Sequence, residues 1–117
     1  MIFNKPNKRK ISILGTEYTI IVERENKNFD KADGYCDESV KEIHIKNHKP
    51  DEYNIKNIHY YYKKVLRHEI VHAFFFESGL HDNALDFGGS WSVNEEMVDW
   101  IAYQFHKIEK VFRELNI

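Results

Sequence analysis

Cysteine is almost absent from this chain of 117 residues, which contains only Cys36. A single cysteine cannot form an intramolecular disulfide, so the chain is not a small secreted scaffold held together by disulfides. A structural zinc site with several cysteine ligands is excluded for the same reason. The scarcity of cysteine suits a reducing compartment, and we expect a cytoplasmic protein.

Long apolar runs and an excess of positive charge are also missing. No stretch approaches the ~18 apolar residues of a membrane span, and the first ten residues lack the apolar segment of a signal peptide. Lys and Arg together number 17 and Asp and Glu 19, for a net charge of −2. One short basic run at 4–10 is most simply a solvated tail. We therefore expect binding to neither membranes nor nucleic acids.

The composition that remains is that of a folded domain. Hydrophobic residues make up 42% of the chain and aromatic residues 15%, which is typical of a globular protein. The length fits one domain with its own core. We expect a single domain over residues 1–117, with residues 1–9 as a flexible tail.

The first half of the chain predicts a small sheet. Residues 10–25 alternate between polar and apolar around Gly15-Thr16, as in a two-stranded hairpin. A loop is expected over 26–33. Residues 34–47 then read as a second extended region with a turn near 37–39.

The second half predicts two helices. From about Asp51 apolar residues recur every three or four positions, and Gly79 is placed to end this helix. A loop with a Gly-Gly pair is expected over 80–90. A second helix then carries an apolar stripe with spacing 4-4-3-4-3, expected to face the core: Met97, Ile101, Phe105, Ile108, Phe112 and Leu115. A small antiparallel or mixed sheet followed by two helices is an α+β domain.

The first predicted helix contains "HEIVH", with His68 and His72 four residues apart and Glu69 between them. Four residues turn a helix by about 400°, so the two imidazoles lie on one face and can bind one Zn²⁺. Glu69 lies beside that face, where its carboxylate can take a proton from metal-bound water. Histidines on a helix are also often ordinary surface groups. The apolar flank of this segment favours burial, which leaves two imidazoles in need of a shared partner.

A third ligand is expected from the second helix. Glu95 and Asp99 are four residues apart on one face, and small Ala102 on the same face lets the helices approach closely. Glu95 is predicted to complete the zinc site, while Asp99 accepts a hydrogen bond from the free ring nitrogen of a ligand histidine.

Three other readings stay open. Residues 92–95 form a capping-box pattern, in which Glu95 would bond back to the amide of Ser92. Glu96 is a reserve ligand, and Cys36 a fourth ligand if the site were purely structural. His81 follows His72 by nine residues, which does not fit the spacing of the three-histidine zinc motif.

These motifs resemble those of the gluzincin branch of zinc metallopeptidases, in which a helix with H-E-x-x-H is followed by a helix with the glutamate ligand. Residues 94–99 match the N-E-x-x-x-D pattern of the thermolysin-like members. The chain also looks like the small ImmA/IrrE-type peptidases of phages and mobile elements, whose glutamate helix matches 95–102 loosely. The resemblance implies a minimal zincin fold, a peptide or protein substrate, and zinc ligands His68, His72 and Glu95. Glu69 would be the general base, and Asp99 would support a ligand histidine.

The resemblance also implies a substrate-binding edge, because in that family the strand before the active-site helix pairs with an extended substrate. Residues 41–47 hold that position here, with Ile43, His44 and Ile45 at the centre. A second electrophile for the oxyanion is not evident, and the candidates are His81, His106 and the tyrosines at 60–62. So short a chain predicts narrow specificity or dependence on a regulatory protein partner. The alternative function is a catalytically inert metal-binding domain that keeps the same fold.

Overall fold

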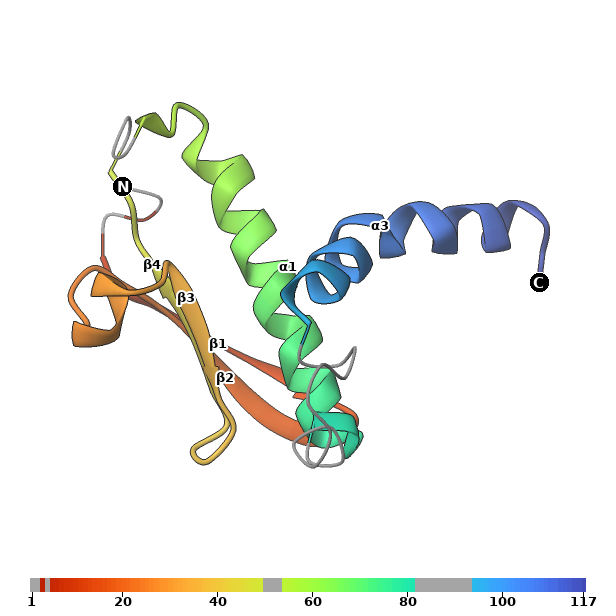
Figure 1. Ribbon diagram of the computed structural model, residues 1–117, viewed down its shortest axis with the longest axis horizontal. Coiled ribbons are helices and arrows are strands. Elements are labelled where there is room, and N and C mark those ends of the chain that lie inside the picture. Colours follow the sequence, from red (N-terminus) through yellow and green to blue (C-terminus); the bar gives the residue numbers. More distant parts are fainter. Residues whose placement is uncertain (1–2, 4, 50–53, 82–93) are drawn as a thin grey trace.

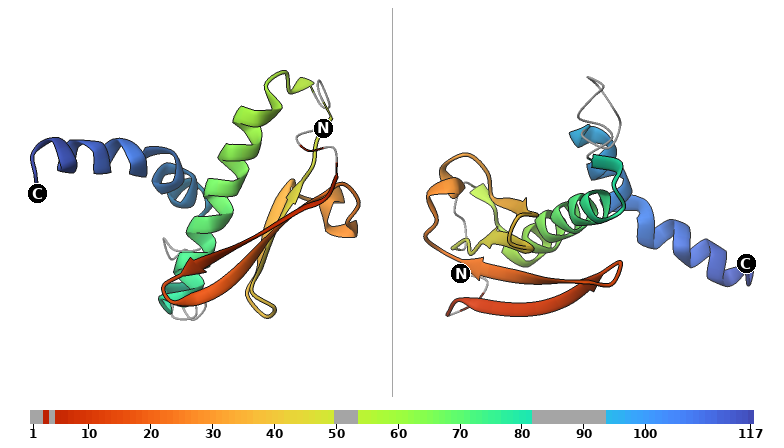
Figure 2. Two further views of the ribbon diagram at one scale, coloured as in Figure 1. Left: turned by 180° about the vertical axis from the view of Figure 1, so that it is seen from behind. Right: turned by 90° about the horizontal axis from the view of Figure 1, so that it is seen from below.

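The computed structural model describes residues 3, 5–49, 54–81 and 94–117. Its elements follow the predicted order of strands and then helices: β1 (Asn7–Ile13), β2 (Thr16–Glu23), the short 3₁₀ helix η1 (Lys27–Asp30), β3 (Gly34–Asp37), β4 (Glu42–Lys46), α1 (Ile58–Glu77) and α3 (Glu95–Glu114). Helix α1 lies across one face of the sheet, and α3 packs on the side of α1 that faces away from the sheet (Figures 1 and 2). The α+β class is confirmed.

The predicted hairpin is present. Leu14 and Gly15 both have positive φ, 49° and 86°, as the two central residues of a tight hairpin turn require. The loop expected over 26–33 contains η1, which Asn26 caps by accepting a hydrogen bond from the amide of Asn28.

The flexible tail expected over 1–9 is wrong for residues 7–9, which belong to a strand. Strand β1 begins at Asn7 and pairs antiparallel with β2 from its first residue. Its basic residues are tolerated because β1 is an edge strand whose side chains are mostly exposed. Phe3 is also held in place, since its amide donates to Asn47 Oδ1 over 3.1 Å and its ring meets Tyr62 edge-on.

The sheet has four strands in the order β1-β2-β4-β3. Strand β2 pairs with β4 in parallel, and β3 pairs with β4 antiparallel. The sheet is therefore mixed, β4 is a central strand, and β3 forms the edge opposite β1.

The core lies between the sheet and α1. Ile43 and Ile45 of β4 share one face, as predicted, and both are buried there. Alternate residues of the hairpin and one small residue of α1 complete the buried cluster: Ile13, Tyr18, Ile20, Val22 and Ala73. Such alternation is what a sheet with one covered face requires.

Helix α1 starts later than expected, at Ile58 instead of near Asp51, because the side chain of Asn57 caps it by accepting from the amide of Tyr60. It ends as predicted, with Gly79 at φ 82°. Residues 50–53 and most of the loop expected at 80–90 lie outside the described residues. In the described part of the chain, neither helix combines the length and apolar character of a membrane span.

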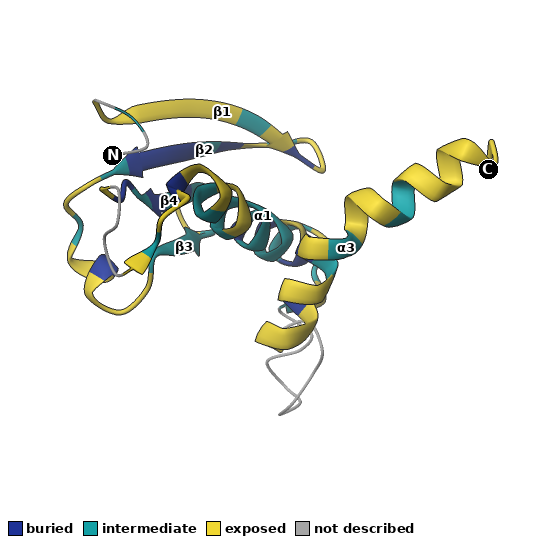
Figure 3. Cartoon of the chain, turned by 90° about the horizontal axis from the view of Figure 1, so that it is seen from above, coloured by how far each residue is buried: buried dark blue, intermediate teal, exposed yellow. Residues whose placement is uncertain are grey.

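The expectation that the apolar stripe of α3 faces the core is also wrong. Val98 and Ala102 are the buried residues of this helix, and they pack toward α1. Four members of the stripe are exposed: Met97, Phe105, Phe112 and Leu115. Figure 3 shows that the half of α3 beyond α1 is almost entirely exposed. The face turned to α1 is the one that carries Glu95 and Asp99, and it lies about 0.4 of a turn from the centre of the stripe.

Glu77 ties the C-terminal end of α1 to the sheet. Its carboxylate accepts hydrogen bonds from Thr16 Oγ1 (3.0 Å) and Tyr18 OH (2.7 Å), and pairs with Lys41 Nζ at 2.7 Å. These donors, Lys41 foremost, lower the pKa of Glu77 to about 2. The carboxylate therefore stabilises the fold chiefly in its charged form.

We expect Glu77→Gln to lower the free energy of unfolding by about 1–2 kcal/mol at pH 7, because the Lys41 pair is lost. The pKa is depressed from 4.5 to about 2 in the folded state, so the contribution is present above pH 4.5 and disappears as the pH falls toward 2. Urea denaturation at pH 7 and at about pH 3 measures the difference, which must shrink in acid. Glu17→Gln, which removes an exposed pair with Lys10, should change little at either pH.

Candidate metal centre

Helix α1 provides two imidazoles on one face, as its H-E-x-x-H spacing predicts. The Nε2 atoms of His68 and His72 lie 3.0 Å apart, and each side chain is 16% exposed. The helix is therefore continuous through the motif and turns both rings to the same point in space.

Helix α3 brings Glu95 to the same point. One carboxylate oxygen lies 2.8 Å from His68 Nε2 and the other 3.4 Å from His72 Nε2. Among the described residues, these three side chains form the group whose ligand atoms all lie within 4.8 Å of one another. The structure thus brings together the three residues predicted as ligands.

The protonation pattern around His68 fits a cation. His68 Nδ1 lies 2.7 Å from Asp99 Oδ1, and a carboxylate only accepts hydrogen bonds, so Nδ1 donates to Asp99 and leaves Nε2 as the ring atom that would bind a cation at the ligand point. Ligand atoms about 2.0–2.2 Å from a tetrahedral cation lie roughly 3.3 Å apart. The observed spacings of 2.8–3.4 Å are close to that value.

Burial favours the neutral, metal-binding form of His72. Its pKa is lowered mainly by burial, and the neighbouring His68 acts in the same direction, while the Glu95 carboxylate opposes both. A neutral imidazole keeps the lone pair that a metal needs.

Glu69 lies beside the group without joining it. Its Oε1 is 4.0 Å from His68 Nε2, and the residue is only 7% exposed. Burial raises the pKa of Glu69 to about 7, with Glu95 and Asp99 adding to the effect and His68 opposing it. A cation at the ligand point would act against this shift. The site therefore holds a buried carboxylate whose charge a bound cation would stabilise.

The capping-box reading of Glu95 is not what the helix adopts. Asn94 caps α3 by accepting a hydrogen bond from the amide of Met97 over 3.1 Å. Ser92 lies outside the described residues. The carboxylate of Glu95 reaches the histidines, whereas the reserve ligand Glu96 lines a different groove beside Lys64 and Arg67.

Two further candidates do not join the group of converging ligand atoms in the described chain. The ring of His81 lies tilted against that of Phe76, with their centroids 4.1 Å apart, and His81 is near enough to His72 to lower the pKa of His72. Cys36, on β3, has a pKa raised to about 12 by burial first and by Glu69 second. A fourth protein ligand from Cys36 is therefore not part of this arrangement.

The candidate electrophiles at 60–62 and 106 are divided among four places. Tyr60 shares a hydrogen bond with Tyr103 on the surface (3.2 Å), and Tyr62 packs against Phe3. His106 lines a groove between the two helices. Tyr61 alone lines the cleft beside His68 and Glu69, where its hydroxyl donates to Asp33.

That cleft is a feature the sequence analysis missed. It measures about 240 Å³, and its walls are Ala32–Gly34, one face of α1 with His68 and Glu69, and Asp99 of α3. Gly34 allows β3 to approach α1, because a Cβ there would lie 2.7 Å from Val65 Cγ1. In the sequence, the glycine at the start of this strand could have indicated a close approach of the backbone to another element.

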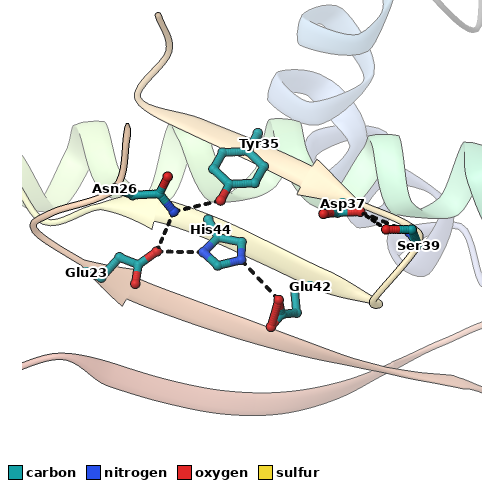
Figure 4. A network of polar contacts seen from close by, with 7 residues as sticks. All are labelled: Glu23, Asn26, Tyr35, Asp37, Ser39, Glu42 and His44. Carbon is teal, nitrogen blue, oxygen red and sulfur yellow. Dashed lines mark hydrogen bonds and ion pairs between the residues drawn. The ribbon is translucent and has the colours of Figure 1, made fainter. Parts of the chain in front are cut away.

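The prediction that residues 41–47 form a substrate-binding edge is wrong. Strand β4 is paired on both sides, so residues 41–47 offer no free edge. Ile43 and Ile45 are buried in the core. His44 lies on the face of the sheet away from α1, between Glu23 (2.7 Å) and Glu42 (3.3 Å), with its ring stacked on Tyr35 (Figure 4). None of the three can contact a substrate at the histidine cluster.

Asp99 provides a test of the metal assignment. We expect Asp99→Ala to weaken zinc affinity by about 10–100-fold without unfolding the chain, because the His68 ring loses the acceptor that fixes its tautomer. Competition with a chromogenic chelator measures the affinity. Asp99→Asn, which keeps an acceptor oxygen but not the charge, should fall between wild type and Asp99→Ala. Equal affinity in all three proteins would leave Asp99 as an ordinary surface carboxylate.

No family model, curated protein or solved structure matches the chain. The resemblance to gluzincins therefore stays a prediction carried by two short motifs.

Proposed function

We propose that the protein is a zinc-dependent hydrolase of peptide bonds, with His68, His72 and Glu95 as metal ligands and Glu69 as general base. The supporting observation is the convergence of three ligand atoms beside a buried carboxylate that stays out of the ligand group. Catalytic zinc sites have three protein ligands and one open position. The side chain of Glu95 is 66% exposed, so the ligand point is open to solvent on that side.

The chemistry divides between the metal and Glu69. Bound Zn²⁺ supplies a Lewis acid and lowers the pKa of a water molecule on it. Glu69 accepts the proton of the attacking water and later delivers it to the leaving amine. Asp99 holds the His68 ring in the tautomer that leaves Nε2 free for the metal.

Among the described strands, β3 forms the sheet edge beside the site, and an extended substrate fits there better than on β4. The cleft runs between the start of β3 and the face of α1 with His68 and Glu69. An exposed edge offers backbone donors and acceptors to a peptide that adds to the sheet as a further strand. A complex with the peptide bound away from β3 would contradict this orientation.

The test uses the full chain purified without added metal. We expect elemental analysis to find about one zinc per chain, and a peptide library to be cleaved by the protein. A chelator should abolish the cleavage, and added Zn²⁺ should restore it. Stoichiometric zinc with no cleavage of any peptide would favour the inert metal-binding domain. Absence of bound metal under all loading conditions would overturn both functions.

A further inference from the structure

The exposed stripe of α3 has the spacing of a helix–helix seam. Counted from the buried Val98 in place of Met97, its apolar residues follow intervals of 3-4-3-4-3 and end at Leu115, which is the pattern of a and d positions in a coiled coil. These six residues are called the seam: Val98, Ile101, Phe105, Ile108, Phe112 and Leu115. Helix α1 covers the stripe only at its start, where Val98 is fully buried. Further along, Phe105 is 62% exposed, Phe112 50% and Leu115 65%. In the part of the chain that the structure describes, more than half of the seam therefore has no helix against it.

An apolar groove of about 380 Å³ adjoins the covered end of this seam. Its walls come from α1 and α3 and are formed mainly by Ile70, Val71, Phe74, Phe75, Ile101 and Phe105. Phe74 is 40% exposed, so the groove is open to solvent. A concave apolar surface between two helices is the shape that receives the apolar face of a third.

We propose that a second copy of this chain binds here, with the two α3 helices antiparallel and the C-terminal half of each in the groove of the other. Residues 95–104 of α3 carry three carboxylates and no Lys or Arg, whereas residues 105–114 carry three cations (Lys107, Lys110 and Arg113) and two carboxylates (Glu109 and Glu114), so the formal net charges of the two halves are −3 and +1. An antiparallel pair sets the basic half of one helix beside the acidic half of the other, while a parallel pair sets like charges together.

The wall of the groove offers a second point of complementarity. Arg67 lines it, and its Nε has no hydrogen-bond partner in the described chain. In the proposed pair, Glu109 of the second copy, which flanks the seam and within its own chain pairs with the exposed Arg113, would lie near this groove. A guanidinium with an unused donor and a carboxylate are matched partners.

The available surface is sufficient for a stable pair. Phe74, Phe105, Phe112 and Leu115 are each 40–65% exposed, which corresponds to roughly 100 Å² of apolar surface for each side chain. Two copies would thus bury about 800 Å² from these residues alone, and their neighbours bring the total within the range of about 1,200–2,000 Å² of specific interfaces. The same patch serves both copies, as a two-fold axis requires.

Sedimentation equilibrium of the full chain over about 1–100 μM tests the proposal. We expect a reversible dimer, and we expect Phe112→Glu to weaken it at least 30-fold, as loss of a central apolar contact typically does. Circular dichroism should show an intact fold, because Phe112 is half exposed in the single chain. Trp100→Glu is the matched control. It changes an aromatic residue of α3 that is 54% exposed but lies off the seam, and should leave the dimer unchanged.

Direction is tested by single cysteines on the seam. Ile108→Cys, near the midpoint, should form an intermolecular disulfide on oxidation, while Leu115→Cys, near the end, should not. Cross-linking of Leu115→Cys as readily as of Ile108→Cys would indicate a parallel pair and overturn the antiparallel arrangement. If the wild-type chain stays monomeric up to about 100 μM, a second copy does not occupy the groove. The same conclusion follows if Phe112→Glu and Trp100→Glu weaken the dimer equally. The proposal does not depend on the metal chemistry.

Discussion

Glu69→Gln is expected to abolish most of the hydrolytic activity while leaving the zinc in place. The amide keeps the size of the carboxylate and its hydrogen bonding, but it cannot accept the proton of the attacking water. A positioned general base contributes about 10²–10⁴-fold, so we expect kcat to fall by at least that factor. Glu69 is outside the ligand group, so zinc content measured by elemental analysis should stay near one per chain.

Glu96→Gln is the matched control for this change. Glu96 follows the ligand Glu95 directly, but its side chain is exposed and lines a different groove. Its conversion to the amide should leave both kcat and zinc content unchanged. Wild-type activity in Glu69→Gln would show that another group takes the proton. Loss of zinc in Glu69→Gln would instead show that the carboxylate helps to hold the metal.

His72→Ala is expected to remove metal and activity together. Two ligands from the described chain would remain, and catalytic zinc sites use three. Zinc content should fall from about one per chain to near zero, with peptide cleavage at the level of the metal-free protein. Thermal stability should also fall, because the ligands come from two helices and metal binding adds to the free energy of folding. Calorimetry with and without chelator measures that contribution.

The control for this loss is His59→Ala on the same helix. His59 is exposed and belongs to the first turn of α1, away from the ligand group. Zinc content, activity and stability should all match the wild type. Full zinc occupancy in His72→Ala would mean that another side chain, such as His81, takes the vacant place.

The local geometry of the site could be predicted from the sequence because it depends on distance within a single helix. The four-residue spacing of His68 and His72 fixes their relative position as soon as the segment is helical. Glu95 and Asp99 were identified in the same way, from their spacing and from small Ala102 nearby. What spacing alone could not provide was the cleft beside Glu69, which depends on how closely β3 approaches α1.

Two expectations were wrong for a different reason, since each needed knowledge of the neighbours. The stripe of α3 was expected to face the core because it is the most apolar face of that helix. The helix is instead rotated so that Glu95 and Asp99 meet the histidines, and Val98 and Ala102 provide the contact with α1. The segment 41–47 was expected at an edge because it precedes α1 in sequence. Strand order is not sequence order here, and β3 forms the edge.

The close approach of Gly34 to Val65 has a consequence for which proteins could serve as substrates. The cleft of about 240 Å³ is smaller than the roughly 300–1,000 Å³ of typical ligand pockets, and its walls are a strand backbone and a packed helix that cannot easily separate. On the proposed function, so small a cleft would receive a single extended chain more readily than an intact helix or a folded hairpin. On the proposed function, the folding state of the target therefore matters as much as its sequence: native proteins are open to attack at termini and at segments that unfold locally.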